Sequence, residues 1–529
     1  MSIFNLEKEV FMVKKRILWV DDEIEFLQPH ILFLKERDYE VSTATNADDA
    51  VTAVREQNID LVLLDEMMPG KDGLTALGEI KRYKPGVPVI MITKNEEESL
   101  MEDAIGSKVD DYLTKPVNPS QILMACKKFL QSRDISQKRM TESSSKRISE
   151  IALRLMEQMD YEDWIEMYLK LTNWDLELDG VPEQQMRDVI YDQRKECNVE
   201  FGKYIDKNYL DWIHGKSEKP KLSVDIVRDF IFPEVNRGHK IVFIVIDCLR
   251  LDQWLTLEPF FYDYFNISKE YYYSILPTAT PFARNAIFSG LYPLDIERRY
   301  PELWAQGEDD DYSRNRYEDK LLYDQLRVLG SKLKTEPKYV KILNADEARS
   351  VEKNLMSYLD APMLSIVVNF VDILAHSRSD LPILKEIAPD EPSYRSLTRS
   401  WFEHSAVYNI FKILANQGYK IILTSDHGSI RCLRGTKVIG DREASTNLRY
   451  KFGRNLKIEP KNALFVKNPK DFKLPQRNFN INYIIAKEDY YFVYPTNYHK
   501  YLAYYRDSFQ HGGISMEEMI LPVVHLQPK

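Results

Sequence analysis

The first quarter of the chain alternates short, mostly apolar runs with amphipathic segments. Three such runs cover residues 16–20, 59–65 and 87–93, and each is long enough for one buried strand. Between the first two, residues 46–58 place apolar side chains at helical spacing. Buried strands that alternate with helices are typical of a parallel sheet with helices on both faces. The pattern therefore predicts an α/β domain, to which we assign residues 1–134.

A helical pattern follows this domain. Residues 136–150 are polar and form either a linker or the first turns of a helix. After them, apolar residues recur every three or four positions, as on one face of a helix. They are Ile148, Ile151, Leu155, Met156, Met159, Trp164, Tyr168 and Leu171. This spacing predicts a small helical bundle, to which we assign residues 135–236.

The α/β pattern returns, on a larger scale, in the C-terminal half of the chain. Three apolar runs, residues 240–247, 363–372 and 419–426, are candidate strands. We assign residues 237–529 to this third domain. A chain of 529 residues is long enough for about three or four domains, so the division agrees with the length. Together the zones predict an α/β multidomain protein with a helical segment in the middle.

The composition excludes several classes of protein. Apolar residues make up 44% and charged residues 29% of the chain, so it can bury a core and is not a disordered tail. The net charge of −10 argues against a general duplex-DNA binder, which needs a basic face. No apolar run approaches the ~18–20 residues of a membrane span, so we expect a cytoplasmic protein. The cysteines are far apart and form no CxxC pair, so we expect neither a thiolate zinc site nor disulfides; they are Cys126, Cys197, Cys248 and Cys432.

Polar side chains follow the strands of the first domain. Asp21 and Asp22 come directly after the first predicted strand, and Asp65 ends the second. Thr93 ends the third, and Lys115 follows the sequence DYLT. Because the carboxyl ends of parallel strands open on one crevice, we expect all five residues in one pocket. Clustered carboxylates repel one another unless a cation neutralises them, and Mg²⁺ suits such an oxygen-rich site, where a lysine and a hydroxyl can hold phosphoryl oxygens.

These residues make the segment resemble a response-regulator receiver domain, which has a flavodoxin-like fold. The matching residues are Asp21-Asp22, residues 65–73, Thr93, Tyr112 and Lys115-Pro116. The resemblance implies that Asp65 accepts a phosphoryl group from a sensor histidine kinase. It also implies that Asp21, Asp22, Asp65 and the backbone carbonyl of Met67 are the ligands of Mg²⁺. Thr93 and Tyr112 would be the switch residues, and Lys115 would contact the phosphoryl group.

Lys94 departs from the receiver pattern, which usually has a small residue after the switch hydroxyl. The size of this residue affects the access of the attacking water, so the rate of dephosphorylation is open. A pseudo-receiver that never takes phosphate is the alternative, but every chemically required group is present.

A second group of polar residues follows the strands of the third domain. Asp247, Asp372 and Asp426 each end a predicted strand and would meet at the same edge of the sheet. Three histidines lie near these aspartates or near the C-terminus. His376 follows Asp372 by four residues, which is one helical turn, and His427 directly follows Asp426. His511 precedes two glycines near the C-terminus. Carboxylates with imidazoles suit Zn²⁺, or Mn²⁺, better than Mg²⁺. With a hydroxyl, the candidates are too many for one tetrahedral ion and fit two ions about 3.5–4 Å apart.

Residues 276–290 supply the hydroxyl. Thr280 would lie at the N-terminus of a helix of small residues, where the helix dipole favours an alkoxide and an incoming phosphate. Metal coordination would lower the pKa of the hydroxyl further. Gly290 follows ten residues later. Thr278 is the alternative nucleophile if the register differs by two residues.

This spacing makes the third domain resemble the alkaline phosphatase superfamily, in which a Ser, Thr or modified Cys nucleophile begins such a helix. Residues 511–524 are similar to its PglZ branch. The resemblance implies two zinc sites, of which one or both are filled. The ligands of one are Asp372, His376 and His511; those of the other are Asp247, Thr280, Asp426 and His427; and Arg284 or Asn285 contacts the substrate. Two alternatives stay open: ordinary strand-terminal and capping residues, which the joint order disfavours, and a metal-bearing binding module without turnover.

Two segments bear on the substrate. Residues 431–461 contain nine Lys or Arg against three Asp or Glu, and could clamp a polyphosphate or an oligonucleotide backbone. A solvated loop that balances acidic surface elsewhere is equally compatible. Residues 490–509 contain nine Tyr or Phe residues, which could stack bases but more often pack a core. We therefore favour nucleotide or oligonucleotide phosphodiesters over simple phosphomonoesters.

The order of receiver, helical bundle and PglZ-type domain resembles the PorX-type response regulators. The resemblance implies a partner sensor histidine kinase, control of type IX secretion, homodimerisation on phosphorylation and a link to transcription through a protein such as a sigma factor. The sequence shows no helix-turn-helix with a basic recognition helix, so we expect no direct reading of duplex DNA. A phosphorylation-controlled zinc phosphodiesterase is the first hypothesis. A metal-bearing module that binds a regulatory partner is the second, and a sulfatase or phosphomutase is the third.

Overall fold

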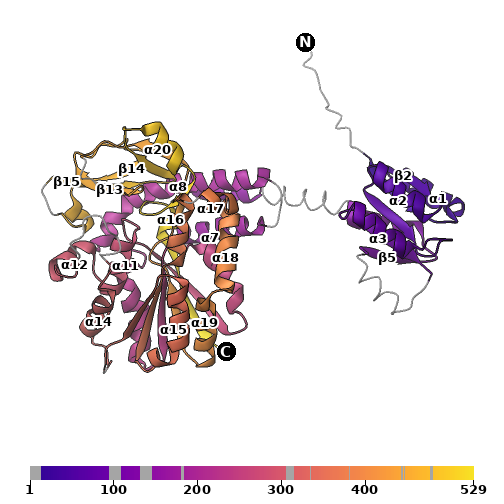
Figure 1. Ribbon diagram of the computed structural model, residues 1–529. Helices are drawn as coiled ribbons and strands as arrows, with labels where there is room; N and C mark the ends of the chain where they lie inside the picture. The colour runs from indigo at the N-terminus through magenta and orange to yellow at the C-terminus, as the bar shows by residue number, and fades with distance from the viewer. Residues whose placement is uncertain are drawn as a thin grey trace, which may run out of the picture. The chain divides into compact units, whose positions relative to one another are not determined.

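The computed structural model describes residues 14–94, 109–130, 146–179, 184–304, 315–333, 335–380, 382–441, 445, 447–476 and 480–529. Contacts divide the chain into two compact units, Met1–Glu150 and Ile151–Lys529, whose elements are labelled in Figure 1. The described ranges contain no helix that is both long enough and apolar enough to cross a membrane. All four cysteines are buried and free of disulfides.

The first unit is a five-stranded parallel sheet in the order β2-β1-β3-β4-β5. Its strands are β1 (Lys15–Val20), β2 (Tyr39–Ala44), β3 (Leu61–Asp65), β4 (Val89–Thr93) and β5 (Asp111–Thr114). Its helices include α1 (Gln28–Lys35), α2 (Ala47–Glu56), α3 (Gly73–Tyr83) and α5 (Pro119–Leu130). This strand order is that of flavodoxin-like folds, so the predicted fold of this domain is confirmed.

The strands of this sheet are buried on both faces, which explains their continuous apolar runs. Along β1, Ile17 and Trp19 pack with residues of α1 and α5, whereas Leu18 and Val20 pack with residues of α2 and α3. Alternate side chains of a strand point to opposite faces, so each strand contributes to two separate cores.

The second unit contains a six-stranded mixed sheet in the order β7-β18-β10-β6-β9-β8. Its strands are β6 (Ile241–Ile246), β7 (Phe265–Tyr273), β8 (Lys338–Ile342), β9 (Met363–Val368), β10 (Lys420–Thr424) and β18 (Ile520–Pro528). Strands β10, β6, β9 and β8 are parallel, whereas β18 is antiparallel to both β10 and β7. The neighbours β10, β6 and β9 therefore end at one edge of the sheet, where the residues that follow them come together.

Helices pack against this sheet. Helices α15 and α19 share a core with β6, β9 and β10, and Figure 1 shows them in front of the sheet. The helices of this region include α9 (Phe232–Asn236), α10 (Leu251–Leu257), α11 (Thr280–Ser289), α12 (Pro293–Arg299), α14 (Glu318–Val328), α15 (Ala345–Tyr358), α16 (Phe370–Asp380), α17 (Pro382–Ile387), α18 (Glu391–Glu403), α19 (Ala406–Asn416) and α21 (Met516–Met519). The α/β fold predicted for this part of the chain is thus confirmed.

One predicted strand is shorter than the sequence analysis proposed. The apolar run 363–372 divides into β9, which ends at Val368, and α16, which begins at Phe370. Asp372 consequently lies in the first turn of a helix and does not end a strand. The periodicity did not reveal this boundary because Phe370 and Val371 pack into the same core as the strand, so the apolar run continues across it.

The segment between His427 and His511 forms an insertion of small sheets. Its elements are β11 (Ile430–Cys432), β12 (Arg434–Lys437), β13 (Tyr450–Arg454), β14 (Ala463–Val466), β15 (Ile481–Ala486), β16 (Tyr490–Val493), α20 (Tyr498–Tyr505) and β17 (Ser508–Gln510). Strand β11 pairs with β17, which brings the beginning and the end of the insertion together. Figure 1 shows β13, β14, β15 and α20 beyond one end of the large sheet.

Two long helices precede the large sheet in the chain and belong to the same unit. They are α7 (Tyr161–Glu177) and α8 (Gln184–Ile213). Trp164, Tyr168 and Leu171 are buried, as the helical spacing predicts, whereas Met156 is 84% exposed. The hydroxyl of Tyr273, in β7, donates to the carbonyl of the first residue of α7 at 2.8 Å. The helical segment therefore packs on the C-terminal sheet domain.

Candidate metal centre and phosphorylation site

Three side chains predicted as ligands of one zinc ion meet at the edge of the large sheet. Asp372 lies in the first turn of α16, His376 one turn later, and His511 directly after β17. The Nε2 atoms of both histidines are 3.4 Å from Asp372 Oδ1, and they are 3.1 Å from each other. Ligand atoms at about 2.0–2.1 Å from a tetrahedral zinc ion are roughly 3.3 Å apart. The three atoms are therefore spaced as ligands of one ion.

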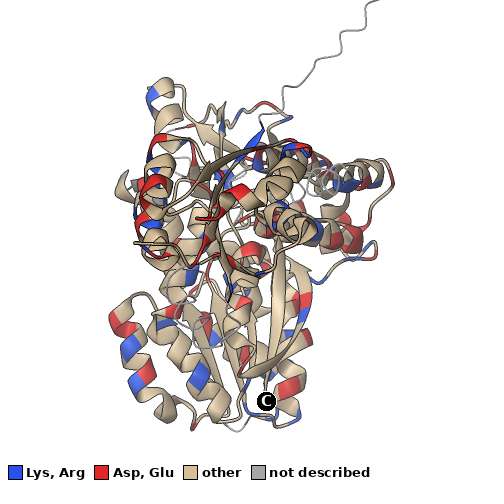
Figure 2. Cartoon of the chain, turned by 90° about the vertical axis from the view of Figure 1, so that its right-hand side faces the viewer, with Lys and Arg blue, Asp and Glu red and all other residues tan. Residues whose placement is uncertain are grey.

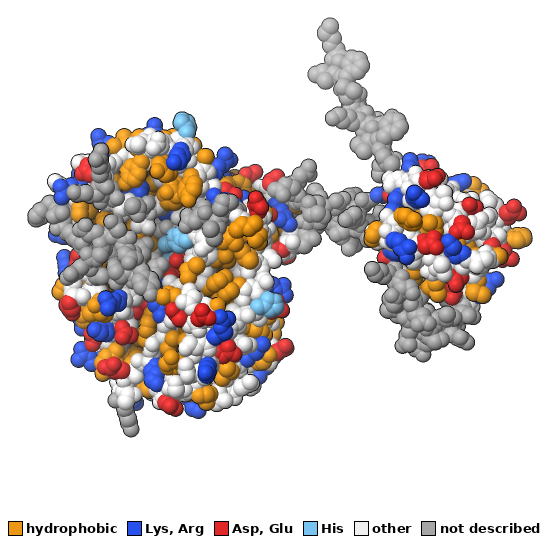
Figure 3. Space-filling view, viewed as in Figure 1, with side chains coloured by type: hydrophobic (Ala, Val, Ile, Leu, Met, Phe, Trp, Pro, Cys, Tyr) orange, Lys and Arg blue, Asp and Glu red, His pale blue; other side chains and the backbone are white. Residues whose placement is uncertain are grey.

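The environment of Asp372 also suits a cation. Its Oδ1 atom is buried and has no hydrogen-bond partner in the part of the chain that the structure describes. Burial would raise the pKa of this carboxyl, but the imidazoles of His376 and His511 hold it well below its usual range, so it is a carboxylate. The side chain of His376 is 50% exposed, and histidine is visible on the face shown in Figure 3. This side of the cluster is therefore open to solvent.

A second cluster contains the other four predicted ligands. Asp247 follows β6, and Asp426 and His427 follow β10. His427 Nε2 is 3.6 Å from Asp247 Oδ1 and 3.7 Å from Asp426 Oδ2. Thr280 Oγ1 is 2.9 Å from His427 Nε2 and 3.3 Å from Asp247 Oδ1. All four side chains are buried, and the distances are those of groups within reach of one ion.

Crowded charges make the second cluster suitable for a cation. Burial and the Asp426 carboxylate raise the pKa of Asp247 to about 7. Burial also raises the pKa of Asp426, whose Oδ2 atom has no hydrogen-bond partner among the residues described. Burial lowers the pKa of His427 to about 3, and its Nδ1 atom is 3.1 Å from a backbone carbonyl, so a neutral ring can present the Nε2 lone pair. A divalent ion would neutralise the carboxylates and accept this lone pair.

The two clusters are neighbours. The rings of His427 and His511 stack with their centroids 4.3 Å apart and their planes at 19°. Centres with two ions need separate ligand sets that hold the ions about 3.5–4 Å apart. The structure thus brings the seven predicted ligands to one place, although they come from five separate segments of the chain.

Thr280 lies where the sequence predicts it. It is the first residue of α11, and the helix ends before Gly290, which has φ +66° in the left-handed region that favours glycine. The hydroxyl of Thr278 donates to Gly513 O at 2.7 Å. Thr280, and not Thr278, is therefore the threonine whose hydroxyl contacts the cluster.

Arg284 and Asn285, for which substrate contact stays a prediction, are both buried. Arg284 is buried; its Nη1 donates to Asp247 Oδ2 at 2.5 Å and its Nε donates to Glu318 Oε1 at 2.6 Å. Asn285 donates to a carbonyl of its own helix at 3.0 Å. Helix α11 is buried along its whole length, so side chains one turn after Thr280 meet protein. Arg284 consequently orients Asp247 and compensates its charge.

Sequence analysis missed three residues that hold the cluster in place. Asn369 donates to Asp247 Oδ2 at 2.7 Å. Asn315 donates to Thr280 O at 3.2 Å and to Glu318 Oε1 at 2.6 Å. The sequence signal for Asn369 was its polar side chain inside the apolar run 363–372. Asn315 and Glu318 belong to no motif, and their role arises only from tertiary packing.

The glycine after His427 allows a close backbone contact. A side chain on Gly428 would lie 1.9 Å from Glu517 O, which no real Cβ atom can do. The Gly428 N–H donates to Glu518 O at 3.1 Å. Helix α21 therefore packs directly against the segment that carries His427.

The basic segment 431–461 is used largely inside the protein. Its described ion pairs include Arg431–Asp507, Arg434–Glu488, Arg434–Asp489 and Arg449–Glu518. Lys451 is buried and donates to Ser445 O at 2.8 Å. Basic and acidic residues alternate along the ribbon of many elements in Figure 2. These contacts favour the structural interpretation of the segment over a clamp for polyphosphate.

Most of the aromatic residues in the range 490–509 pack inside the insertion. Tyr491, for example, is buried in an apolar core of the insertion, whereas Phe509 stacks on a tyrosine of α18, outside the insertion, with the centroids 4.2 Å apart. Tyr501 and Tyr504, in α20, are in contrast 37% and 46% exposed. Core packing therefore accounts for much of the aromatic run and leaves two exposed rings.

The predicted phosphorylation site is assembled in the first unit. Asp21, Asp22 and Asp65 form a carboxylate cluster at the ends of β1 and β3. Lys115 Nζ is 2.9 Å from both Asp21 Oδ2 and Asp65 Oδ1. Burial and the neighbouring aspartates raise the pKa of Asp65, in opposition to the effect of Lys115. Carboxylate oxygens crowded in this way suit a hydrated Mg²⁺ ion.

The other predicted receiver residues lie on β4 and β5 or just after β3 and β4. Thr93 ends β4 and is buried. The Tyr112 hydroxyl is buried without a hydrogen-bond partner among the described residues. Met67 follows β3 with its side chain 66% exposed, and the role of its carbonyl stays a prediction. Lys94 is exposed and lines the same depression as Asp21.

Three segments of the chain match known protein families. Residues 17–127 match the response regulator receiver domain, and residues 134–213 match the PorX response regulator linker domain. Residues 226–526, more than half of the chain, match the BREX system PglZ alkaline phosphatase-like domain. The chain belongs to the PglZ family. Its receiver, PorX linker and PglZ domain are those of a PorX-type response regulator, so the predicted family is confirmed.

Individual relatives resemble the receiver of this PglZ-family protein. The transcriptional regulatory protein ResD of Bacillus subtilis is 36% identical over 116 residues, which are 22% of this chain and 48% of ResD. The chemotaxis protein CheY of Halobacterium salinarum is 35% identical over 112 residues, 21% of this chain and 92% of CheY. A CheY-like receiver structure from Methanospirillum hungatei JF-1 is 28% identical and covers 23% of this chain and 99% of its own, with a TM-score of 0.23. The chain thus spans only about half the length of ResD.

Proposed function

We propose that phosphorylation of Asp65 controls a zinc-dependent phosphodiesterase in the PglZ domain. The observation that carries this proposal is the place of the Thr280 hydroxyl, 2.9 Å from His427 Nε2 at the N-terminus of α11. A hydroxyl among carboxylate and imidazole ligands can act as a nucleophile, whereas a purely structural metal site needs none. The match to an alkaline phosphatase-like domain supports hydrolysis by this centre.

The proposed centre binds two zinc ions, or Mn²⁺ in their place. The ligands of one ion would be Asp372, His376 and His511, and those of the other would be Asp247, Thr280, Asp426 and His427. Bound ions would lower the pKa of the threonine hydroxyl and neutralise charge that develops on the phosphoryl oxygens. In the receiver, the proposed ligands of Mg²⁺ are Asp21, Asp22, Asp65 and the Met67 carbonyl.

Thr280 is the proposed nucleophile. Its oxygen forms a bond to phosphorus while the bond between phosphorus and the leaving alcohol breaks, and the alcohol takes up a proton. Water then attacks this threonine phosphodiester, so that the hydroxyl of the water stays on the released phosphomonoester and its proton returns to the threonine oxygen. Arg284 and Asn369 hold Asp247 in place during both steps. The dipole of α11 favours negative charge near the reacting oxygen.

The substrates that we propose are nucleotide or oligonucleotide phosphodiesters. The exposed rings of Tyr501 and Tyr504 in the insertion offer surfaces on which bases can stack. His376 is half-exposed, so one side of the proposed centre faces solvent. A substrate can therefore reach the centre from outside.

Hydrolysis of a chromogenic phosphodiester by the full-length protein with added Zn²⁺ tests this function. Thr280→Val removes the hydroxyl at nearly constant volume and should lower turnover by at least about a thousandfold. Thr278→Val is the matched control and should retain turnover, because that hydroxyl only donates to a backbone carbonyl. Equal turnover by Thr280→Val and the wild type would exclude this mechanism. Sulfate esters and phosphomonoesters, assayed in parallel, distinguish a sulfatase or a phosphomutase.

The receiver domain implies a cognate sensor histidine kinase. Beyond this, we propose that the protein acts in the cytoplasm, forms a homodimer on phosphorylation and regulates type IX secretion, with a sigma factor as a partner in transcription. The match to the PorX linker domain supports this role. If Thr280→Val preserved the regulatory output while Asp65→Ala abolished it, the metal domain would instead act as a module that binds a regulatory partner.

A further inference from the structure

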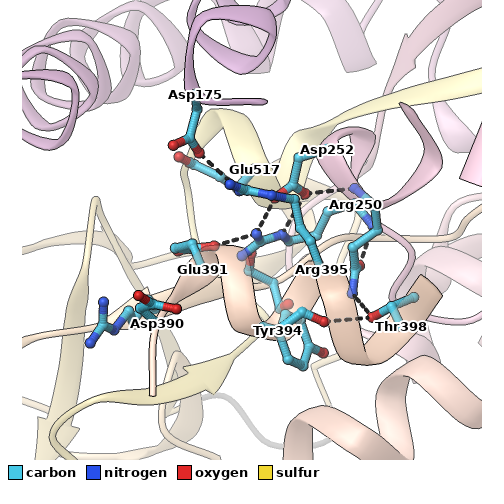
Figure 4. Close-up of polar contacts among 12 residues, drawn as sticks. Asp175, Arg250, Asp252, Asp390, Glu391, Tyr394, Arg395, Thr398 and Glu517 are labelled. Carbon is cyan, nitrogen blue, oxygen red and sulfur yellow. Dashed lines mark hydrogen bonds and ion pairs between the residues drawn. The ribbon is translucent and has the colours of Figure 1, made fainter. Parts of the chain in front are cut away.

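Helices α7 and α8 contact the metal domain through buried charges. Both lie in the segment that matches the PorX linker domain. Arg395, in α18, is 1% exposed and bonds to both sides of this interface: its Nη1 donates to Asp175 of α7 at 2.9 Å and to Asp252 of α10 at 3.1 Å. Its Nε donates to Asp179, just after α7, at 3.0 Å. Figure 4 shows Asp175, Arg395 and Asp252 in line.

This series of contacts continues to the segment that carries His427. Arg250 is fully buried, and its Nε donates to Asp252 Oδ1 at 2.9 Å. Its side chain passes beside Gly428, and its Nη1 donates to Ser429 O at 3.5 Å. Burial would raise the pKa of Asp252, but the guanidinium groups of Arg250 and Arg395 hold it below its usual range. The carboxylate therefore stays charged between two cations.

Arg250 also lies over the segment that leads to His511. Its guanidinium is 5.2 Å from the centre of the Phe509 ring, two residues before His511. Phe509 is buried and has no free space to move into, so a shift of this guanidinium would displace the ring. Arg250 thus packs against the residues that precede His511 and against those that follow His427.

A second branch starts from α8. Asn198 donates to Glu517 Oε2 at 2.9 Å and accepts from Met516 N–H at 2.9 Å, which fixes α21 to α8. The adjacent residue Glu518 accepts the Gly428 N–H at 3.1 Å. Because no space is left at Gly428, a displacement of α21 must move the backbone next to His427.

We propose that α7 and α8 position His427 and His511 through these two branches, so that the zinc affinity of the centre depends on how the linker helices are docked. The inference rests on the metal centre proposed above. Groups that orient metal ligands tune metal affinity, and their loss typically costs about 10–100-fold. Buried charge networks transmit such effects because breaking one partner leaves the others uncompensated.

Substitution of Asp175 breaks the charge network between α7 and the metal domain with the least change in packing. It is 14% exposed and accepts from Arg395 at 2.9 Å and from Arg194 at 3.2 Å. Asp175→Asn removes one charge at constant size. Glu166→Gln is the matched control, because Glu166 lies on the same helix, is 64% exposed and pairs only with Lys170 among the described ion pairs.

The experiment measures zinc affinity of the full-length protein by competition with a chromogenic chelator, in excess Mg²⁺ to fill the receiver. Asp175→Asn should weaken zinc binding about tenfold, whereas Glu166→Gln should bind as the wild type does. Denaturant unfolding of the metal-free forms shows whether Asp175→Asn still folds. If it does not, Asn198→Ala cuts the other branch and should weaken zinc binding in the same way.

Unchanged zinc affinity of a folded Asp175→Asn or Asn198→Ala variant would overturn the inference and leave the interface a purely structural one. A wild type that binds zinc but does not hydrolyse diesters would refute the proposed function alone. A wild type that binds no zinc would overturn both.

Discussion

Thr280 Oγ1 lies 2.9 Å from His427 Nε2, although 147 positions separate the two residues in the sequence. One begins a helix and the other follows a central strand, and both are buried at the same edge of the sheet. A hydroxyl placed in this way has a lone-pair partner, two nearby carboxylates and a helix N-terminus around it. Because of these surroundings, substitution of Thr280 is the most direct test of the chemistry proposed for the PglZ domain.

A covalent intermediate on Thr280 is the first expectation. During diester turnover, an acid-quenched sample of the wild type should carry, on this residue, a phosphoryl group that is still esterified to the retained half of the substrate. Thr280→Ser should still turn over, because serine keeps the hydroxyl. Mass spectrometry of peptides from the quenched protein detects the modification. Turnover without any phosphoryl group on Thr280 would mean that water attacks the substrate directly.

His376 should hold one of two zinc ions. His376→Gln removes one of three closely spaced ligand atoms, so we expect the bound zinc to fall by one equivalent per chain. Elemental analysis of dialysed protein measures the stoichiometry. His404→Gln is the control, since His404 is an exposed histidine that ends α18. A variant with the zinc content of the wild type would show that this cluster does not bind the ion.

Lys94 should slow the loss of phosphate from Asp65. It is exposed and lines the depression that also contains Asp21 and Lys115, so we expect its long side chain to obstruct water that attacks the phosphoryl group. After loading with acetyl phosphate, Lys94→Ala should lose its phosphoryl group several-fold faster than the wild type. Phosphate-affinity gels follow the decay, and Lys35→Ala on the exposed side of α1 should decay as the wild type does. Equal or slower decay of Lys94→Ala would contradict the expectation.

Lys451 should make the stability of the second unit depend on pH. Burial lowers its pKa from 10.5 to about 7. The folded state therefore binds this proton more weakly than the unfolded state does. Burial of the ammonium lowers the free energy of unfolding by its full amount below pH 7, and this loss disappears as the pH rises toward 10.5. At its largest this loss is about 4–5 kcal/mol.

Lys451→Met removes this titration. Urea unfolding at several pH values should show the free energy advantage of the variant to be constant below pH 7 and to shrink by about 1.4 kcal/mol per pH unit above it. Lys457→Met, at an exposed position of the same segment, should show no such trend. If the free energy of unfolding changed with pH in the same way for the wild type and Lys451→Met, the titration of this ammonium would have no effect on folding.

Much of the candidate site could be predicted from the sequence because it depends on local order. Asp247 and Asp426 follow apolar runs that are long enough for one strand, and parallel neighbours must end at one edge. Asp372 and His376 are one helical turn apart, so any helix through them brings both to one face. The receiver cluster follows in the same way from the ends of its strands.

The sequence could not decide the contacts between distant segments. Nothing in the sequence indicated that Arg284 lies between Asp247 and Glu318. The boundary between β9 and α16 was hidden in one apolar run. The docking of α7 and α8 through Arg395 has no signature in the chain at all.

The sequence by itself determined which side chains can serve as metal ligands, nucleophile and phosphoryl acceptor, together with the strands and helices that carry them. Only the tertiary structure decided which charged groups surround those side chains, such as Arg284 behind Asp247 and Arg250 beside Gly428. The physical reason is that local periodicity sets the direction of a side chain relative to its own element. Its partners are set by packing between elements, and a buried charge takes whichever opposite charge that packing brings within reach.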